Sequence, residues 1–168
     1  MNKALLSSKD PKWRTPPDVV ELVRAFFGGP PDLDPCSEAD SLVGARRDYR
    51  LEERGEDGLA LPWRGRVYCN PPYGRGLLMW LLKAEREARV EGAEILLLCP
   101  ARTDTAWFRV AWAASAVAFL RGRLKFVGAE SSAPFPSALV LWSPTPDAST
   151  ERLSAVLGDR AQVAVALP

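Results

Sequence analysis

Apolar positions near the start of the chain recur at helical spacing. Six of them follow the i, i+3, i+4, i+7 pattern that gathers side chains on one face of a helix: Val19, Val20, Leu22, Val23, Phe26 and Phe27. Thr15 is the candidate N-cap of this helix, and Gly28-Gly29 ends the pattern. We expect a short extended piece at residues 32–35, and residues 37–63 are charged and predict mostly loop.

Strand and helix patterns alternate through the middle of the chain. Residues 66–69 predict a short buried strand, and residues 77–91 predict a helix with one broad apolar face. The apolar run at residues 95–99, which Pro100 ends, is typical of a strand buried on both faces of a sheet. Thr103 and Asp104 then predict the start of a further helix.

The C-terminal third of the chain predicts more closely spaced strands. Residues 117–120, 124–126 and 138–142 alternate or run apolar, and residues 150–157 predict a weak helix before an apolar tail at 163–167. Strands alternating with helices indicate an α/β fold, with a mostly parallel sheet and helices on both faces. The closely spaced strands predict an antiparallel edge to this sheet.

Length and composition narrow the class of protein. The 168 residues are in the usual range of one domain, so we expect a single domain over residues 1–168, with residues 1–12 and the last residues as flexible ends. Hydrophobic residues make up 47% and charged residues 26%, which argues against disorder. A net charge of +1 excludes a strongly basic coat protein, but it leaves nucleic-acid binding open because a local basic patch is enough.

The sequence contains no histidine, which excludes several kinds of catalytic and metal-binding site. A chain without histidine has no Ser-His-Asp triad, no histidine base and almost none of the ordinary zinc sites, so we expect no metal. Cys36, Cys69 and Cys99 stand singly and predict no disulfide framework. No apolar run approaches the length of a signal sequence or a membrane span, which predicts a cytoplasmic protein without a membrane partner.

The chemistry is concentrated in Asn70-Pro71-Pro72-Tyr73, which directly follows a predicted strand, where open α/β sheets have their ligand crevice. The Asn70 side-chain oxygen can accept a hydrogen bond from an exocyclic amine, and the carbonyl of Pro71 can accept a second one. The two prolines hold both acceptors still, and Tyr73 provides a flat face for a planar base. Two acceptors on one amine expose its lone pair for direct attack on an electrophilic methyl group, without a histidine base.

Together with this motif, an ordered set of segments resembles the small phage-type DNA N-6-adenine methyltransferase family, whose members use S-adenosylmethionine. These segments are residues 13–17, 32–36, 56–59, 70–75, 100–108, 121–126 and 132–137. The resemblance implies a trimmed Rossmann-like, S-adenosylmethionine-dependent methyltransferase sheet. Asn-Pro-Pro-Tyr alone is less specific, because methyltransferases that act on RNA and on protein glutamine share it.

The resemblance also implies roles for individual residues. Asn70, Pro71, Pro72 and Tyr73 would be catalytic and would hold the target base. Thr15 and Pro16 would meet the methionine end of the cofactor, Asp34 would lie near its amino group, and Asp57 would contact its adenine. The full set implied to bind the cofactor is Trp13, Thr15, Pro16, Asp34, Pro35, Cys36, Asp57 and Asn70.

Two departures from the family pattern bear on the cofactor site. No Gly-rich loop follows the first predicted strand, where Cys36-Ser37-Glu38-Ala39 stands instead. Only 36 positions separate Asp34 from Asn70, whereas a single βαβ unit already needs ~30 residues. The sheet must therefore be trimmed on this side, and the contact to the cofactor ribose is left unassigned.

Basic residues form a candidate strip for DNA phosphates. Residues 102–125 contain five basic residues against one acidic residue, which fits either phosphate binding or a solvated face. Thr103 and Asp104 fit either a DNA contact or a simple helix cap, and the loop at 128–136 is the candidate for reading bases. The residues assigned to DNA are Arg75, Arg102, Thr103, Asp104, Arg121, Arg123 and Lys125.

These observations predict an enzyme that binds S-adenosylmethionine, flips an adenine out of DNA and methylates its exocyclic N-6 amine. One alternative keeps the chemistry but changes the acceptor to RNA or to a protein glutamine. The other is a catalytically silent nucleic-acid-binding module on a methyltransferase scaffold, which the missing Gly-rich loop favours. DNA is the expected partner. The expected location is the host cytoplasm if a phage encodes the chain. The sequence predicts no oligomeric state.

Overall fold

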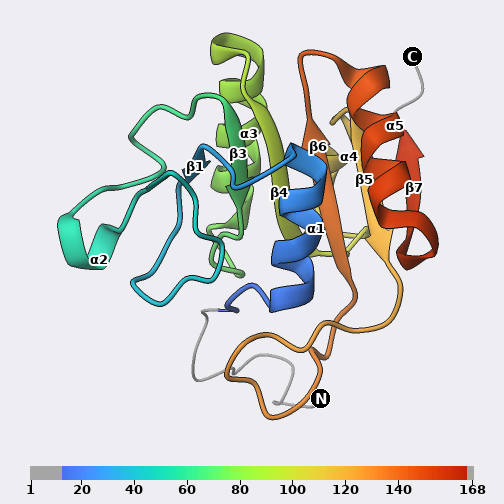
Figure 1. Ribbon diagram of the computed structural model, residues 1–168, viewed down its shortest axis with the longest axis horizontal. Coiled ribbons are helices and arrows are strands. Elements are labelled where there is room, and N and C mark those ends of the chain that lie inside the picture. Colours follow the sequence, from blue (N-terminus) through green and yellow to red (C-terminus); the bar gives the residue numbers. More distant parts are fainter. Residues whose placement is uncertain (1–12, 166–168) are drawn as a thin grey trace.

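A seven-stranded mixed sheet forms the centre of the computed structural model, which describes residues 13–165 (Figure 1). The flexible ends expected at residues 1–12 and at the last residues lie outside the described residues. The strand order is β2-β1-β3-β4-β6-β5-β7. The strands are β1 (Leu33–Asp34), β2 (Arg47–Asp48), β3 (Arg66–Cys69), β4 (Glu94–Pro100), β5 (Ala116–Leu120), β6 (Ser137–Trp142) and β7 (Ala161–Val165).

One half of the sheet is parallel and the other half is antiparallel. Strands β2, β1, β3 and β4 pair in parallel. Strand β6 lies antiparallel between β4 and β5, and β7 pairs antiparallel with β5. The expected mixture of parallel and antiparallel strands is confirmed, although the antiparallel pairing reaches the middle of the sheet and is not limited to its edge.

Helices cover both faces of the sheet, as the alternating pattern predicts. They are α1 (Pro17–Phe27), α2 (Leu51–Arg54), α3 (Leu77–Glu91), α4 (Phe108–Trp112), α5 (Pro146–Leu157) and the 3-10 helix η2 (Gly158–Arg160). Leu96 and Leu98 of β4 are buried on the side of α1 and α5, whereas Ile95 and Leu97 are buried on the side of α3 and α4. Successive side chains of a strand point to opposite faces, so this one strand contributes to both cores.

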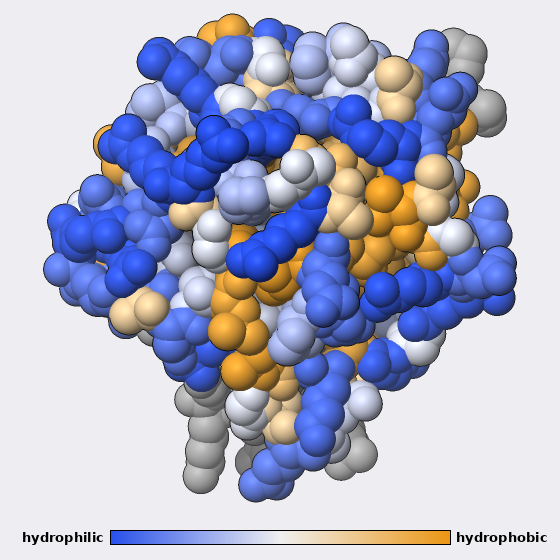
Figure 2. Space-filling model, in the orientation of Figure 1, coloured by the Kyte–Doolittle hydropathy of each residue, from blue (hydrophilic) through white to orange (hydrophobic). Residues whose placement is uncertain are grey.

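The surface over α1 is only partly hydrophilic. Figure 2 shows apolar surface between hydrophilic side chains in the middle of this face, while hydrophilic side chains dominate its periphery. Among the described residues, no helix combines the length and the apolar character that crossing a membrane requires.

Helix α1 begins differently from the sequence prediction. Pro16, not Thr15, is the N-cap residue, and no side chain caps the helix. The carbonyl of Pro16 accepts hydrogen bonds from the amides of Val19 and Val20, both at 3.1 Å. The predicted cap is wrong because the Thr15 hydroxyl is used by Tyr68 of β3, at 3.0 Å. The end is as predicted, since Gly28 has φ 69° and closes the helix with its amide.

Two other predicted elements are wrong. Residues 124–126 form no strand; instead Val127 makes an isolated bridge with Arg14, and its amide donates to the Arg14 carbonyl at 3.0 Å. Thr103 and Asp104 lie in a turn and start no helix, because α4 begins only at Phe108 with Trp107 as its N-cap.

The segment between Asp34 and Asn70 is trimmed, as its length requires. It contributes only the two-residue β2, the one-turn α2 and β3, and the first two of these lie in the stretch predicted as mostly loop. Further along the chain, α5 starts at Pro146, four residues before the predicted start, and β7 takes up the described part of the apolar tail.

Strands β1 to β5 all run in one direction, since β6 reverses against both β4 and β5. The loops that follow their carboxyl ends therefore share one edge of the sheet, the region where open α/β sheets bind ligands. Helix α1 starts beside this edge, because Thr15 contacts Tyr68 near the end of β3.

Candidate functional site

The loops that follow β1 and β3 enclose an open cleft together with residues 13–15. The cleft contains about 570 Å³ of space, including its mouth. Its lining includes seven residues that the sequence assigned to cofactor or base binding: Trp13, Thr15, Asp34, Cys36, Asn70, Pro71 and Pro72. Arg14, Val127 and residues of the loop after β1 complete it. The fold therefore brings together residues that are more than 50 positions apart in sequence.

Asp34 places a buried carboxyl group in this cleft. It is 4% exposed, and its Oδ1 accepts a hydrogen bond from the Cys36 amide at 3.1 Å. Burial raises the pKa of Asp34 to about 7, although the Cys36 amide lowers it in part. Among the described residues, no Lys or Arg pairs with it at ion-pair distance. A buried carboxyl group without a cation gains most from a ligand that brings an ammonium group.

Asn70 lies directly after β3, and its side-chain amide is held on both sides. Its Nδ2 donates to the carbonyl oxygen of Trp13 and to Thr15 Oγ1, the latter at 3.0 Å. Its Oδ1 accepts a hydrogen bond from the Tyr73 hydroxyl at 2.9 Å. Pro71 is buried and Pro72 is exposed, and both line the cleft. The motif thus presents a fixed amide oxygen beside a backbone that proline makes rigid.

Tyr73 belongs to an aromatic cluster with Trp13, Phe126 and Phe135. The Tyr73 ring meets Phe126 and Phe135 edge to face, with centroids 6.2 and 5.7 Å apart, and Trp13 lies 5.2 Å from Phe126. Apolar surroundings raise the pKa of Tyr73 well above its ordinary value, so its hydroxyl stays a proton donor. Sequence reasoning assigned no individual role to Phe126 or Phe135, although Phe135 lies in the loop at 128–136 that was the candidate for reading bases. Both residues also lie in segments shared with the family.

A second hollow continues the cleft past Arg14, Cys36 and Pro72 and contains about 960 Å³ of space, including the open space at its mouth. Asp57 lines it, while Asp57 Oδ1 also accepts a hydrogen bond from the Leu59 amide at 2.9 Å, which stabilises the turn. Its other lining residues include Pro35, Tyr49, Gly58 and Trp80. The two hollows together offer space for an elongated ligand.

The wall at Asp57 is fixed by contacts on both sides. A Cβ added at Gly58 would come within 1.9 Å of the Pro35 carbonyl oxygen, so glycine is required for this close approach. The Trp63 indole donates to the Gly58 carbonyl at 2.7 Å, and the Trp63 amide donates to the buried Glu87 carboxylate at 2.9 Å. Helix α3 thereby anchors the turn that carries Asp57.

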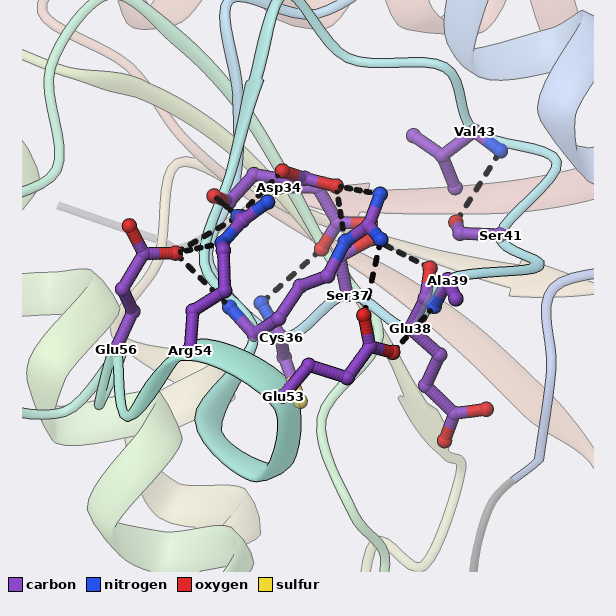
Figure 3. Close-up of polar contacts among 12 residues, drawn as sticks. Asp34, Cys36, Ser37, Glu38, Ala39, Ser41, Val43, Glu53, Arg54 and Glu56 are labelled. Carbon is purple, nitrogen blue, oxygen red and sulfur yellow. Dashed lines mark hydrogen bonds and ion pairs between the residues drawn. The ribbon is translucent and has the colours of Figure 1, made fainter.

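The loop after β1 is held by the polar network in Figure 3. Glu53 accepts a hydrogen bond from the Ala39 amide at 3.0 Å and pairs with Arg50 at 3.1 Å. Arg50 and Arg54 both pair with Asp48 at 2.7 Å, and although burial opposes it, their contacts lower the pKa of Asp48. Short segments without a regular structure are thus fixed around the cleft by ion pairs.

The remaining predicted cofactor and base residues lie next to the cleft. Pro16 and Tyr73 lie beside its lining, Pro16 buried at the start of α1 and Tyr73 in the aromatic cluster.

Four of the residues predicted to contact DNA are exposed: Arg75, Arg102, Thr103 and Asp104. Arg102 lies 6.0 Å from the Phe135 ring centroid, on the edge of the aromatic cluster.

Three of the predicted DNA residues form a separate basic group. Arg121, Arg123 and Lys125 are exposed and line a hollow after β5. The structure adds Arg160, which sequence reasoning missed because it lies 35 positions beyond Lys125. Arg160 pairs with Asp18 at 3.0 Å, so three of the four cations have no ion pair among the described residues.

Comparison with known proteins adds one finding. A family model described as DNA N-6-adenine-methyltransferase (Dam) matches residues 2–156, which is most of the chain. Neither the curated proteins nor the solved structures contain a match to the chain. Among the described residues, no group of His, Cys, Asp and Glu side chains is arranged to hold a metal ion.

Proposed function

The chain belongs to the DNA N-6-adenine-methyltransferase family, and from this premise we propose that it transfers a methyl group from S-adenosylmethionine to the exocyclic N-6 amine of adenine in DNA. The proposal includes a single methyltransferase domain over residues 1–168 and a trimmed Rossmann-like sheet. The observation that carries it is the presence of Asp34 and Asn70 in the lining of one cleft, at the carboxyl ends of adjacent parallel strands.

The residues of the cleft fit S-adenosylmethionine. The buried Asp34 carboxylate would pair with the ammonium group of the methionine part, which supplies the cation that the described residues do not. Trp13, Thr15 and Cys36 line the same space. The second hollow, with Pro35 and Asp57, would take the adenosine part. When bound there, the cofactor supplies an electrophilic methyl group on sulfur.

The Asn-Pro-Pro-Tyr motif would hold the acceptor. Asn70 Oδ1 and the Pro71 carbonyl oxygen would accept the two hydrogens of the adenine amine, which directs the nitrogen lone pair toward the cleft. Tyr73, with the aromatic cluster around it, would stack on the flipped base. The motif would thus orient the amine for direct attack on the methyl group that the cofactor would supply, and the proton of the amine would then go to water. Positioning and fixed dipoles therefore supply the catalysis, without a general base.

The basic group after β5 would contact DNA phosphates. Arg121, Arg123 and Lys125 follow β5, which runs in the same direction as β1 and β3, so they share the sheet edge with the cleft. Exposed cations at this edge would hold the backbone while the base enters the motif. Arg75, Arg102 and Thr103 are exposed on loops of the same edge and would complete the phosphate contact, whereas the exposed Asp104 carboxylate would meet hydrogen-bond donors of the bases.

Labelled methyl transfer tests the proposal. The purified protein is incubated with S-adenosylmethionine labelled in the methyl group and with duplex DNA, structured RNA or a glutamine-containing protein, and the products are digested to nucleosides or amino acids. We expect label in N-6-methyladenine from DNA. Label in RNA or glutamine alone would shift the acceptor, and no transfer together with no heat of cofactor binding would identify a silent module.

A further inference from the structure

The side-chain amide of Asn70 is useful for clamping an amine in only one of its two orientations. Its oxygen accepts hydrogen bonds and its NH2 group donates them, and the two ends have nearly the same shape. If the NH2 group faced the substrate amine, two donors would meet and the clamp would repel its target. Some contact within the protein must therefore hold the oxygen on the substrate side.

Two acceptors occupy the NH2 group of Asn70. Nδ2 donates to the Trp13 carbonyl oxygen and to Thr15 Oγ1, so both of its hydrogens are used. The Trp13 carbonyl can only accept, so a flipped amide would set oxygen against oxygen there. Oδ1 consequently points the other way, where the Tyr73 hydroxyl donates to one of its two lone pairs and leaves the other for a substrate.

Thr15 is itself fixed in position. It is 7% exposed, and its Oγ1 lies 3.0 Å from the hydroxyl of the fully buried Tyr68, two residues before Asn70. Burial raises the pKa of Tyr68, so this partner stays a neutral hydroxyl. The next residue, Pro16, starts α1 with its carbonyl bonded to the amides of Val19 and Val20. Strand β3 and helix α1 thus fix Thr15 from two sides.

We propose that Thr15 is a positioning residue, which with Tyr68 and the Trp13 carbonyl holds the Asn70 amide with its oxygen facing the reacting amine. The proposal rests on the proposed function. It differs from the role that the family resemblance implies for Thr15, which is contact with the methionine end of the cofactor. The two roles separate experimentally, since a positioning residue changes the chemical step and a cofactor contact changes the affinity for the cofactor.

The test compares Thr15→Val, which keeps the shape but removes the hydroxyl, with Thr15→Ser, which keeps the hydroxyl. The wild-type protein must first form N-6-methyladenine in duplex DNA. Failure at this step would contradict the proposed function, whereas failure in the variants would contradict the role of Thr15. Single-turnover rates are then measured at saturating cofactor and DNA, and cofactor affinity is measured by calorimetry. We expect Thr15→Val to slow the chemical step about tenfold or more, as loss of a preorganised contact does. The cofactor affinity of Thr15→Val should stay within about twofold of wild type, because the substitution removes no contact to the cofactor. The single-turnover rate of Thr15→Ser should stay within about threefold of wild type, because serine keeps the hydroxyl that holds Asn70.

Three results would overturn the proposal: a wild-type rate in Thr15→Val, a loss confined to cofactor affinity, or equal slowing in Thr15→Ser. If Thr15→Val does not fold, Tyr68→Phe decides, because it removes only the hydroxyl that holds Thr15. A slower chemical step with unchanged cofactor affinity in Tyr68→Phe supports the proposal, and a wild-type rate contradicts it.

Discussion

At the scale of single residues, Asp34 connects the fold with pH. Its carboxyl group has an ordinary pKa of 3.8, and burial raises this to about 7 in the native protein. Between these values the native state keeps a proton that the unfolded chain releases, so rising pH destabilises the fold across this window. We predict that Asp34→Asn is more stable than wild type at pH 8 and close to it at pH 4, as measured by urea unfolding. The exposed Asp159→Asn is the control, and an equal difference at both pH values would contradict the assignment.

The same carboxyl group gives a prediction for the cofactor. Asp34→Asn keeps the shape but removes the charge that would pair with the ammonium group. We expect S-adenosylmethionine to bind more weakly by about 1.5–3 kcal/mol at pH 8, the usual value of a charge-assisted contact. Isothermal titration with folded protein measures this, and unchanged affinity would remove Asp34 from the cofactor site.

The sequence predicted several residues that line the cleft, but it did not predict the contacts among them. Asn70 to Tyr73 could be found because the motif follows a recognisable strand, and Asp34 because it ends another. The bonds from Asn70 to Trp13 and Thr15 join residues 57 and 55 positions apart, and no local pattern encodes them. Thr15 was mistaken for a cap because a threonine before a helix fits that role, whereas its hydroxyl bonds to β3.

At the scale of elements, periodic segments were predictable and very short ones were not. The helix at residues 77–91 has the predicted bounds, because fifteen residues give several turns of apolar spacing. Strand β2 has two residues and helix α2 has four, too few for any period to appear. The strand predicted at 124–126 was wrong because its apolar residues pack in the core without a ladder: Phe126 is buried among aromatic rings and Leu124 packs beside the same core.

The turn that carries Asp57 gives a prediction at this scale. In Gly58→Ala, the added Cβ would lie 1.9 Å from the Pro35 carbonyl oxygen and 3.1 Å from Trp80, so the two walls of the second hollow must separate. We expect a loss of about 1–3 kcal/mol in stability, the usual cost of overpacking, together with weaker cofactor binding. Thermal unfolding and calorimetry measure the two effects. Gly76→Ala is the matched control, because a Cβ there meets no atom within 4 Å and φ is −82°. Equal behaviour of the two variants would show that the contact with Pro35 is unimportant.

At the scale of the whole molecule, a net charge of +1 hides a separation of charges. Six acidic residues line the second hollow against two basic ones, Arg14 and Arg50; the acidic residues are Glu38, Asp40, Glu52, Glu53, Glu56 and Asp57. Basic residues gather after β5, at Arg121, Arg123 and Lys125. The polyanionic substrate would therefore meet a different surface of this sheet edge from the adenosine part of the cofactor.

The basic group predicts how DNA binding depends on salt. Arg123→Ala should weaken binding by a similar factor for all sequences and reduce the slope of log affinity against log salt by about one unit, as loss of one phosphate contact does. Arg89→Ala, exposed in the last turn of α3, changes the same charge and should leave the slope unchanged. Fluorescence anisotropy over a range of salt concentrations measures both, and equal slopes would identify the group as a solvated face.

The central claim is that Asn70 clamps the adenine amine for methyl transfer. Single-turnover methylation of a DNA duplex, at saturating S-adenosylmethionine, tests it with Asn70→Ala against wild type. Removing one of two fixed acceptors should slow the chemical step by about two orders of magnitude or more, while cofactor affinity changes little. A wild-type rate of N-6-methyladenine formation in Asn70→Ala would contradict the account.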